Sequence, residues 1–182
     1  MAIDRIETER LILVPITLDM VEAVFAGDRA RAEGLAQARL PEAWPGRALI
    51  ERAFSADLDA IRADPAARLW GDRLMITRPS TMNLREARRI VGSVIFHGRP
   101  VDGIAEVGYG VELDSQGRGF ATEATRACVA WALEQAECRA VQATTYPWHR
   151  ASLRVIEKIG MALAGTREHE MFGELLVFEK RR

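Results

Sequence analysis

Cysteine is scarce in this chain. Two of its 182 residues are cysteines, Cys128 and Cys138, and their separation of ten residues matches no common metal-binding pattern. Cys128 lies within an apolar helical pattern, so we expect it in the hydrophobic core. The sequence therefore predicts no metal site and no disulfide scaffold, and it favours a reducing compartment, the cytoplasm.

Long apolar runs and an excess of one charge are also absent. The longest apolar stretch covers Ala127–Leu133, far short of the roughly 18 residues that indicate a membrane span. The first ten residues are charged, unlike the apolar centre of a signal peptide. Lys and Arg number 25 against 26 Asp and Glu, whereas nucleic-acid-binding proteins usually carry a basic excess. We therefore expect neither a membrane nor a nucleic acid as partner.

Apolar runs and turn residues follow one another in an order typical of a mixed α/β domain built on one sheet. Short runs predict strands over Leu11–Val14, Leu69–Thr77, Ile90–His97, Ile104–Leu113, Ala140–Thr145 and Leu175–Lys180. A helical period predicts helices over Leu18–Ala26, Arg29–Ala38, Leu49–Ala63, Phe120–Gln135 and Ala151–Ile159. We expect a loop at Pro41–Gly46, a turn at Thr166–Gly173 between two late strands, and an antiparallel meander in the middle of the sheet. The chain is expected to form one domain, residues 1–182.

The segment from Val111 to Thr122 carries most of the chemical information. It predicts a strand, a glycine-rich turn and the start of a helix. Such a turn presents unpaired backbone N–H groups at the positive end of the helix dipole, which suits a phosphate group. Gly117 and Gly119 permit unusual backbone angles and close approach of a ligand, and Arg118 adds positive charge at the rim.

Three kinds of phosphate site compete for this turn. A nucleoside-triphosphate P-loop requires Gly-Lys-Ser/Thr, which is missing here. A dinucleotide fingerprint requires a small residue at position 122 and an acid at the end of the next strand, where Thr144 and Thr145 stand instead. The third kind fits better, because Gln116-Gly-Arg-Gly-Phe-Ala121 matches Gln/Arg-x-x-Gly-x-Gly/Ala, the pyrophosphate-binding motif of the GNAT N-acetyltransferases.

The neighbouring segments resemble the RimJ/RimL-like branch of the GNAT superfamily. They occur in the family's order and are densest from Ile90 to Gly165. They are Thr8–Leu11, Trp44–Pro45, Val107–Tyr109, Ala121–Ala124 and Ala151–Gly160. The resemblance implies the GNAT fold, a mostly antiparallel sheet with splayed strands flanked by helices. It also implies a coenzyme A-binding core at about residues 90–165 and a helical, acceptor-side segment at about 18–63.

The resemblance implies acetyl-CoA as co-substrate. The strand Ile104–Leu113 would carry a bulge, at Gly108 or Gly110, and would splay from the next strand to admit pantetheine. Its backbone groups at Val111 and Leu113 would pair with that arm, and an amide within Tyr109–Val111 would polarise the thioester. The coenzyme-binding residues would be Val111, Leu113, Gln116, Gly117, Arg118, Gly119, Phe120, Ala121, Thr122, Ser152 and Arg154, with Arg150 also available for the 3′-phosphate.

The resemblance further implies direct transfer to an amine without an acyl-enzyme. Glu106, which shares a strand face with Gly108 and Gly110, is the candidate to bind or deprotonate the amine; alternatively it is a solvated surface charge. Ser152 aligns with the family's serine near the coenzyme sulfur, although a serine there also suits a helix start. Tyr146 is a second candidate acid, or a packing residue.

One position departs from the family pattern. His149 replaces the asparagine that usually stands three residues before the serine. Either a coenzyme contact is lost at a tolerated surface replacement, or the imidazole takes part in acid–base chemistry. Of the other conspicuous residues, His97 is expected to be structural and Trp131 to lie in the core. His169 between two glutamates is not expected to bind a metal, because adjacent strand residues point to opposite faces.

The expected activity is acetyl transfer to a protein N-terminus, an amino acid or a small amine. The acceptor would sit between the early helices, the Pro41–Gly46 loop and the late hairpin. Two other functions stay open: a non-catalytic acyl-CoA-binding sensor or partner, and a nucleotide-binding α/β protein. A homodimer is also possible, because relatives are often dimers.

Overall fold

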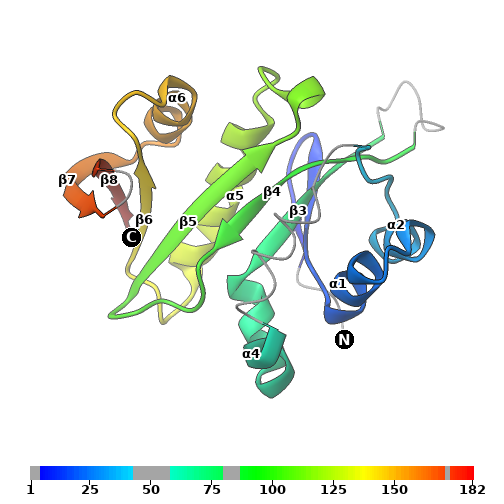
Figure 1. Ribbon diagram of the computed structural model, residues 1–182. Helices are drawn as coiled ribbons and strands as arrows, with labels where there is room; N and C mark the ends of the chain where they lie inside the picture. The colour runs from blue at the N-terminus through cyan, green and yellow to red at the C-terminus, as the bar shows by residue number, and fades with distance from the viewer. Residues whose placement is uncertain (1–4, 43–57, 80–86, 171–172) are drawn as a thin grey trace.

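The computed structural model describes residues 5–42, 58–79, 87–170 and 173–182. They form an eight-stranded sheet in the order β1-β2-β3-β4-β5-β6-β8-β7 (Figure 1). The strands are β1 (Ile6–Glu7), β2 (Leu11–Pro15), β3 (Asp72–Thr77), β4 (Ile90–Phe96), β5 (Ile104–Val111), β6 (Ala140–Thr145), β7 (Ala162–His169) and β8 (Gly173–Arg181). All neighbours are antiparallel except β5 and β6, which run parallel. The predicted meander and mostly antiparallel sheet are confirmed.

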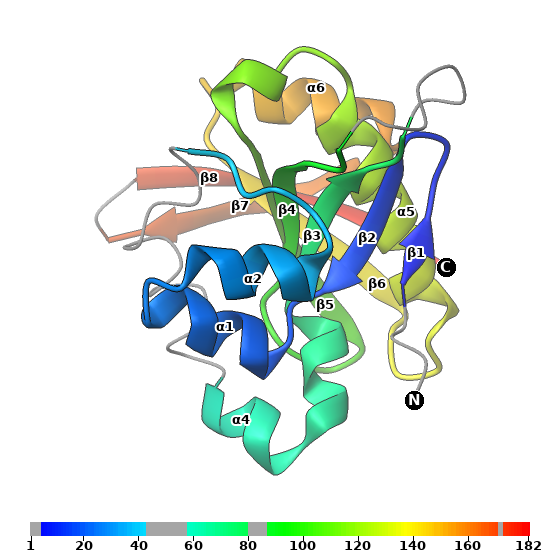
Figure 2. The same ribbon diagram turned by 90° about the vertical axis from the view of Figure 1, so that its right-hand side faces the viewer.

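Helices cover both faces of the sheet (Figure 2). They are α1 (Leu18–Phe25), α2 (Arg29–Ala36), α4 (Leu58–Ala63), α5 (Phe120–Glu134) and α6 (Arg150–Lys158), with 3₁₀ helices at Pro65–Trp70 and Leu113–Ser115. The side chain of Thr17 caps α1 by accepting a hydrogen bond from the Met20 amide, as its sequence position predicts. No helix in the described ranges is long and apolar enough to cross a membrane.

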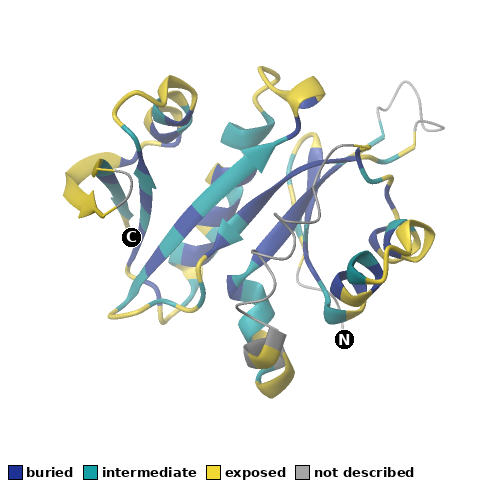
Figure 3. Cartoon of the chain, in the orientation of Figure 1, coloured by how far each residue is buried: buried dark blue, intermediate teal, exposed yellow. Residues whose placement is uncertain are grey.

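Strand residues alternate between two buried clusters. Leu11 and Leu13 of β2 belong to the buried cluster on the α5 side of the sheet, whereas Ile12 between them belongs to the cluster that includes residues of α1 and α2. This follows from the strand period of two, because both faces of the central strands are covered. Cys128 is fully buried in the α5 cluster, and Trp131 packs against it, as expected. Figure 3 shows the buried residues concentrated in these central strands.

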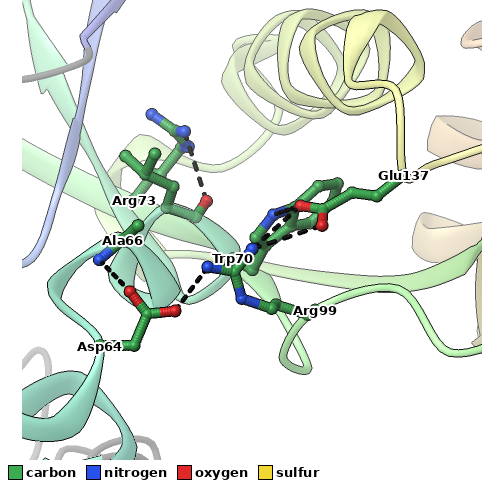
Figure 4. Close-up of polar contacts among 7 residues, drawn as sticks. Asp64, Ala66, Trp70, Arg73, Arg99 and Glu137 are labelled. Atoms are coloured by element: carbon green, nitrogen blue, oxygen red, sulfur yellow. Dashed lines mark hydrogen bonds and ion pairs between the residues drawn. The ribbon is translucent and has the colours of Figure 1, made fainter.

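The end of the sheet where β5 and β6 begin is closed by a network of hydrogen bonds and ion pairs (Figure 4). Arg99 pairs with Asp64 at 2.5 Å and with Glu137 at 3.2 Å. The indole N–H of Trp70 donates to Glu137 at 2.7 Å. The amide of Arg139, just before β6, donates to the Gly103 carbonyl, just before β5, at 2.8 Å. The two parallel strands are therefore held together at their start.

Several predicted boundaries are wrong. The strand predicted at Leu69 begins instead at Asp72, because the side chain of Asp64 caps a 3₁₀ helix over Pro65–Trp70. The predicted turn at Thr166–Gly173 is largely strand, since β7 continues to His169 and pairs with β8. That strand is exposed along its whole length (Figure 3), so it carries no apolar alternation for the sequence to reveal.

Two further predicted elements differ from the observed ones at one end. The strand predicted to reach Leu113 ends at Val111, and Leu113 begins a 3₁₀ helix. The helix predicted over Leu49–Ala63 is observed as α4 from Leu58. Its first part and most of the Pro41–Gly46 loop lie outside the described residues.

Candidate active site: a gap between β5 and β6

The two parallel strands separate soon after they begin. They pair over Ile104–Glu106 of β5 and Ala140–Gln142 of β6. Beyond that point β5 continues along β4 and β6 continues along β8, and the two strands diverge (Figure 1). The splay expected from the sequence is therefore present. The expected bulge in β5 is not, because the register with β4 runs without a shift from Val107 to Val111.

The register of β5 fixes which backbone groups face the gap. The carbonyl of Glu106 accepts from His97 at 3.1 Å, and the amide of Glu112 donates to Val91 at 3.0 Å. Even-numbered residues of β5 therefore bond to β4, and in an antiparallel pair the alternate residues direct their backbone groups to the other side. Val107 still lies at the end of the β5–β6 ladder, because Glu106 pairs with Gln142. The backbone groups of Tyr109 and Val111 lie beyond that ladder and face the gap, where an extended ligand could pair with them.

A glycine turn lies beyond the end of β5. Gly117 and Gly119 have φ of 73° and 82°, in the left-handed region that favours glycine. A Cβ at Gly117 would meet nothing within 4 Å, so its backbone angle explains the residue. Gly119 is the N-cap of α5 and supplies no side chain to the first amides of that helix. The turn therefore offers backbone N–H groups at the positive end of the helix dipole, as predicted.

Glu106 lies on the face of β5 that also carries Gly108 and Gly110. Its carboxylate accepts a hydrogen bond from the Thr144 hydroxyl of β6 at 2.8 Å and lies 3.8 Å from the guanidinium of Arg167 of β7. Its side chain is 34% exposed. Glu106 is therefore a held carboxylate at the start of the gap, accessible to a ligand. A Cβ at Gly110 would meet nothing within 4 Å, so this face of the strand has room beyond Glu106.

Ser152 and Tyr109 meet across the gap on the opposite face. Ser152 lies in the first turn of α6 and is 8% exposed. The hydroxyl of Tyr109 lies 2.9 Å from the Ser152 Oγ and 3.1 Å from its carbonyl oxygen. Burial raises the pKa of the Tyr109 hydroxyl above its ordinary value, and the hydrogen bond to Ser152 offsets part of that rise. Sequence reasoning considered only the backbone of Tyr109 and missed this side chain.

The family model for the acetyltransferase (GNAT) domain matches residues 10–162. The chain belongs to the GNAT acetyltransferase family. A curated relative, the uncharacterized protein YkkB of Bacillus subtilis, is 36% identical over 63 residues, which is 35% of this chain and 37% of that protein. The match thus spans little more than a third of either protein.

Solved structures of the GNAT fold cover nearly the whole chain. The ribosomal-protein-S5-alanine acetyltransferase of Vibrio fischeri has a TM-score of 0.66 at 17% identity, over 97% of this chain and 96% of that chain. RimL, a ribosomal L7/L12 α-N-protein acetyltransferase in complex with coenzyme A, has a TM-score of 0.64 at 14% identity, over 98% of both chains. Identities this low establish a common fold only. The family match over residues 10–162 makes the protein an acyltransferase of the GNAT family.

Two of the GNAT-like segments contact each other. Glu123, in the first turn of α5, accepts hydrogen bonds from the Thr8 hydroxyl at 2.6 Å, the Arg10 amide at 2.8 Å and the Arg10 Nε at 2.7 Å. Arg10 also donates to the carbonyl of Arg118 in the glycine turn at 2.8 Å, and its guanidinium lies 4.9 Å from the centre of the Phe120 ring. The N-terminal segment thus braces the turn. Both segments resemble the family in sequence, but the sequence pattern does not predict this contact between them.

The remaining predicted coenzyme residues lie after the end of β5 and in the first turns of α5 and α6. The Gln116 side chain donates to the Val111 carbonyl at 3.0 Å, which ties the turn to the end of β5. Leu113 is 84% exposed beyond that end. Ala121 and Thr122 lie partly exposed in the first turn of α5, and Arg154 is exposed on α6 with Arg150.

The segment between β6 and α6 carries Tyr146 and His149, the other two candidates for acid–base chemistry. Tyr146 stacks on Trp148 with ring centres 4.7 Å apart and planes at 11°, which fits the packing alternative for this tyrosine. His149 is the N-cap of α6, and its side chain makes no capping hydrogen bond. Among the residues that the structure describes, no group of three or more side chains is arranged to hold a metal ion.

Proposed function

We propose that this GNAT enzyme transfers an acetyl group from acetyl-CoA to a primary amine by direct attack in a ternary complex. The observation that supports this most strongly is the continuity of two features. The gap beside Tyr109 and Val111 lies next to the glycine turn, which the Gln116 side chain ties to the Val111 carbonyl. The pantetheine arm would pair with the gap-facing backbone groups of β5, and the pyrophosphate would accept hydrogen bonds from the turn.

The acceptor amine would approach over the open face of β5. Gly110 leaves open space there, and Glu106 lies on the same face with Thr144 and Arg167 as partners. An α-amino group has a pKa near 8 and needs little help, whereas a lysine side chain near 10.4 needs a base. Glu106 would hold the amine and accept its proton, directly or through water.

The transfer then requires few groups. The amine nitrogen attacks the thioester carbonyl carbon, whose oxygen is polarised by an amide of the Tyr109–Val111 backbone. The new C–N bond forms, the C–S bond breaks, and the sulfur leaves with the electron pair. The nitrogen loses its proton toward Glu106. Ser152, at the start of α6, would donate a hydrogen bond to the departing thiolate.

The acceptor class is a primary amine: a protein N-terminus, an amino acid or a small amine. The structural neighbours named above include enzymes named for ribosomal proteins, so N-terminal peptides belong in the first screen. The cytoplasm, with its acetyl-CoA and free amines, is the proposed compartment.

Calorimetric titration with acetyl-CoA tests the binding half of this proposal. Gly117→Asp places a carboxylate in open space at the proposed pyrophosphate position, so we expect binding to be lost. The matched control is Gly27→Asp, since Gly27 ends α1 at φ 70° and a Cβ there also meets nothing within 4 Å. Equal loss of binding in both variants, or none in either, would contradict the proposed site.

Release of free thiol from acetyl-CoA in the presence of an amine panel tests the catalytic half. We expect turnover with at least one of the N-terminal peptides, free amino acids or small amines. Tight binding of acetyl-CoA without thiol release across that panel would contradict amine acetylation.

A further inference from the structure

The contact between Tyr109 and Ser152 joins two elements that the sheet leaves apart. Tyr109 belongs to β5 and Ser152 to α6, which follows β6. The two strands are not paired with each other beyond Glu106 in the described register. The tyrosine ring packs against the α5 cluster, so its hydroxyl reaches Ser152 from a fixed base. This hydrogen bond therefore crosses the gap on its α5 and α6 face.

The Tyr109 hydroxyl can donate only one hydrogen bond, because it carries one proton. Its oxygen lies within 3.1 Å of two oxygens of Ser152, the Oγ and the carbonyl oxygen. A serine in the first turn of a helix can otherwise turn its hydroxyl onto a nearby backbone carbonyl. When Tyr109 donates to Ser152 Oγ, the serine keeps its own proton available for another acceptor. Burial raises the pKa of Tyr109, so the phenol stays protonated at neutral pH.

We propose that Tyr109 is a positioning residue, whose hydroxyl donates to Ser152 Oγ and thereby turns the serine O–H toward the coenzyme sulfur. This inference rests on the proposed function and on the place of Ser152 beside that sulfur. Tyr109 acts through Ser152 and does not touch the thiolate. The sulfur carries the electron pair of the broken C–S bond, accepts a hydrogen bond from Ser152, and later takes its proton from solvent.

The bound thiol of coenzyme A reports this arrangement without an acceptor. A hydroxyl aimed at the sulfur stabilises the thiolate, so the thiol of bound coenzyme A should ionise at lower pH than that of free coenzyme A. Thiolate absorbance in the ultraviolet, recorded against pH, gives this pKa. We expect Tyr109→Phe, which keeps the ring and its packing, to raise the pKa of the bound thiol by about one unit. Ser152→Ala is expected to raise it by at least as much.

The double variant decides whether Tyr109 works through Ser152. In the Ser152→Ala background we expect Tyr109→Phe to cause no further shift, because the group that it positions is gone. Additive shifts would overturn the proposal, and so would a shift caused by Tyr146→Phe and not by Tyr109→Phe. Calorimetry on the same proteins separates this inference from the proposed function. A folded wild type that does not bind coenzyme A contradicts both, whereas binding with an unshifted thiol in Tyr109→Phe contradicts only the inference.

Discussion

Because Glu123 links the N-terminal segment to the glycine turn, removing its negative charge should lower the stability of the folded protein by a predictable amount. In Glu123→Gln the side chain keeps its size, but the carboxylate that accepts three hydrogen bonds becomes an amide with a single acceptor oxygen. One amide N–H₂ then faces donors of Thr8 or Arg10. The turn above it, through the Arg118 carbonyl, loses part of its support.

The expected magnitude follows from these contacts. Hydrogen bonds to a charged group contribute about 1.5–3 kcal/mol each when buried, whereas exposed ion pairs contribute about 0–1 kcal/mol. The Glu123 side chain is 16% exposed and that of Arg10 is 45% exposed, so the brace lies between these limits. We expect Glu123→Gln to lower the free energy of unfolding by about 2 kcal/mol at pH 7. For a chain of this length that corresponds to a fall in Tm of roughly 4–8 °C.

The dependence on pH gives a second, independent signature. Burial disfavours the charged form of Glu123, but the hydrogen bonds from Thr8 and Arg10 and the Arg10 charge together hold its pKa below the ordinary value of 4.5. A lowered pKa in the folded state stabilises the protein above the unfolded value, and this stabilisation is lost as the pH falls through the folded value. The difference between wild type and Glu123→Gln should therefore shrink below about pH 4.5.

Thermal unfolding from pH 7 to pH 3, followed by circular dichroism, checks both statements. The matched control is Glu134→Gln, because Glu134 is exposed in the last turn of the same helix. We expect the control to move Tm by little at any pH. An equal fall in Tm for both variants, or a difference from wild type that does not change with pH, would refute the brace.

Three further predictions concern the core, the thiols and the reaction. A Cβ at Gly92 would lie 2.2 Å from the Gly110 carbonyl oxygen, so Gly92→Ala should destabilise the protein by about 2 kcal/mol or more. Gly34→Ala, in open space within α2, should instead stabilise it by about 0.5–1 kcal/mol. Denaturant unfolding measures both changes in stability, and changes of the same sign would contradict the packing at Gly92. Burial raises the pKa of the Cys128 thiol to about 12, so this thiol should resist alkylation at pH 8 until the protein is unfolded. Mass spectrometry locates the label, and alkylation of Cys128 in the native protein would show that the residue is not buried. Glu106→Gln should lower kcat about tenfold or more and leave acetyl-CoA affinity unchanged in calorimetry; unchanged turnover would exclude Glu106 as the base.

Much of the fold could be predicted from local sequence patterns. The period of the apolar residues places α5 and β4 within one or two residues of their observed bounds, and Thr17 marks the start of α1. The late hairpin could not be placed in this way. The strand β7 is exposed on both faces, and its pairing, such as Arg167 with Leu175 of β8, depends on register rather than on a local signal.

In the candidate site, too, features contiguous in sequence could be predicted, whereas contacts between distant residues could not. The glycine turn was predicted because it is contiguous in sequence, and its two positive φ angles are confirmed at Gly117 and Gly119. The contacts of Glu123 with Arg10 and of Tyr109 with Ser152 join residues far apart in the chain. Such pairs follow from the tertiary packing of β5, α5 and α6, which no single segment encodes. The roles assigned to Glu106, Ser152 and His149 stay predictions.

The central claim is that the pantetheine arm of the coenzyme occupies the gap beside β5. Amide hydrogen exchange, followed by NMR with and without coenzyme A, tests it at single residues. The amides of Tyr109 and Val111 face the gap, whereas those of Gly108 and Gly110 face β4 and serve as internal controls. We predict that coenzyme A slows exchange at Tyr109 and Val111 and leaves the two glycines nearly unchanged. Bound coenzyme that protects the glycine turn but neither of these two gap-facing amides would contradict the account.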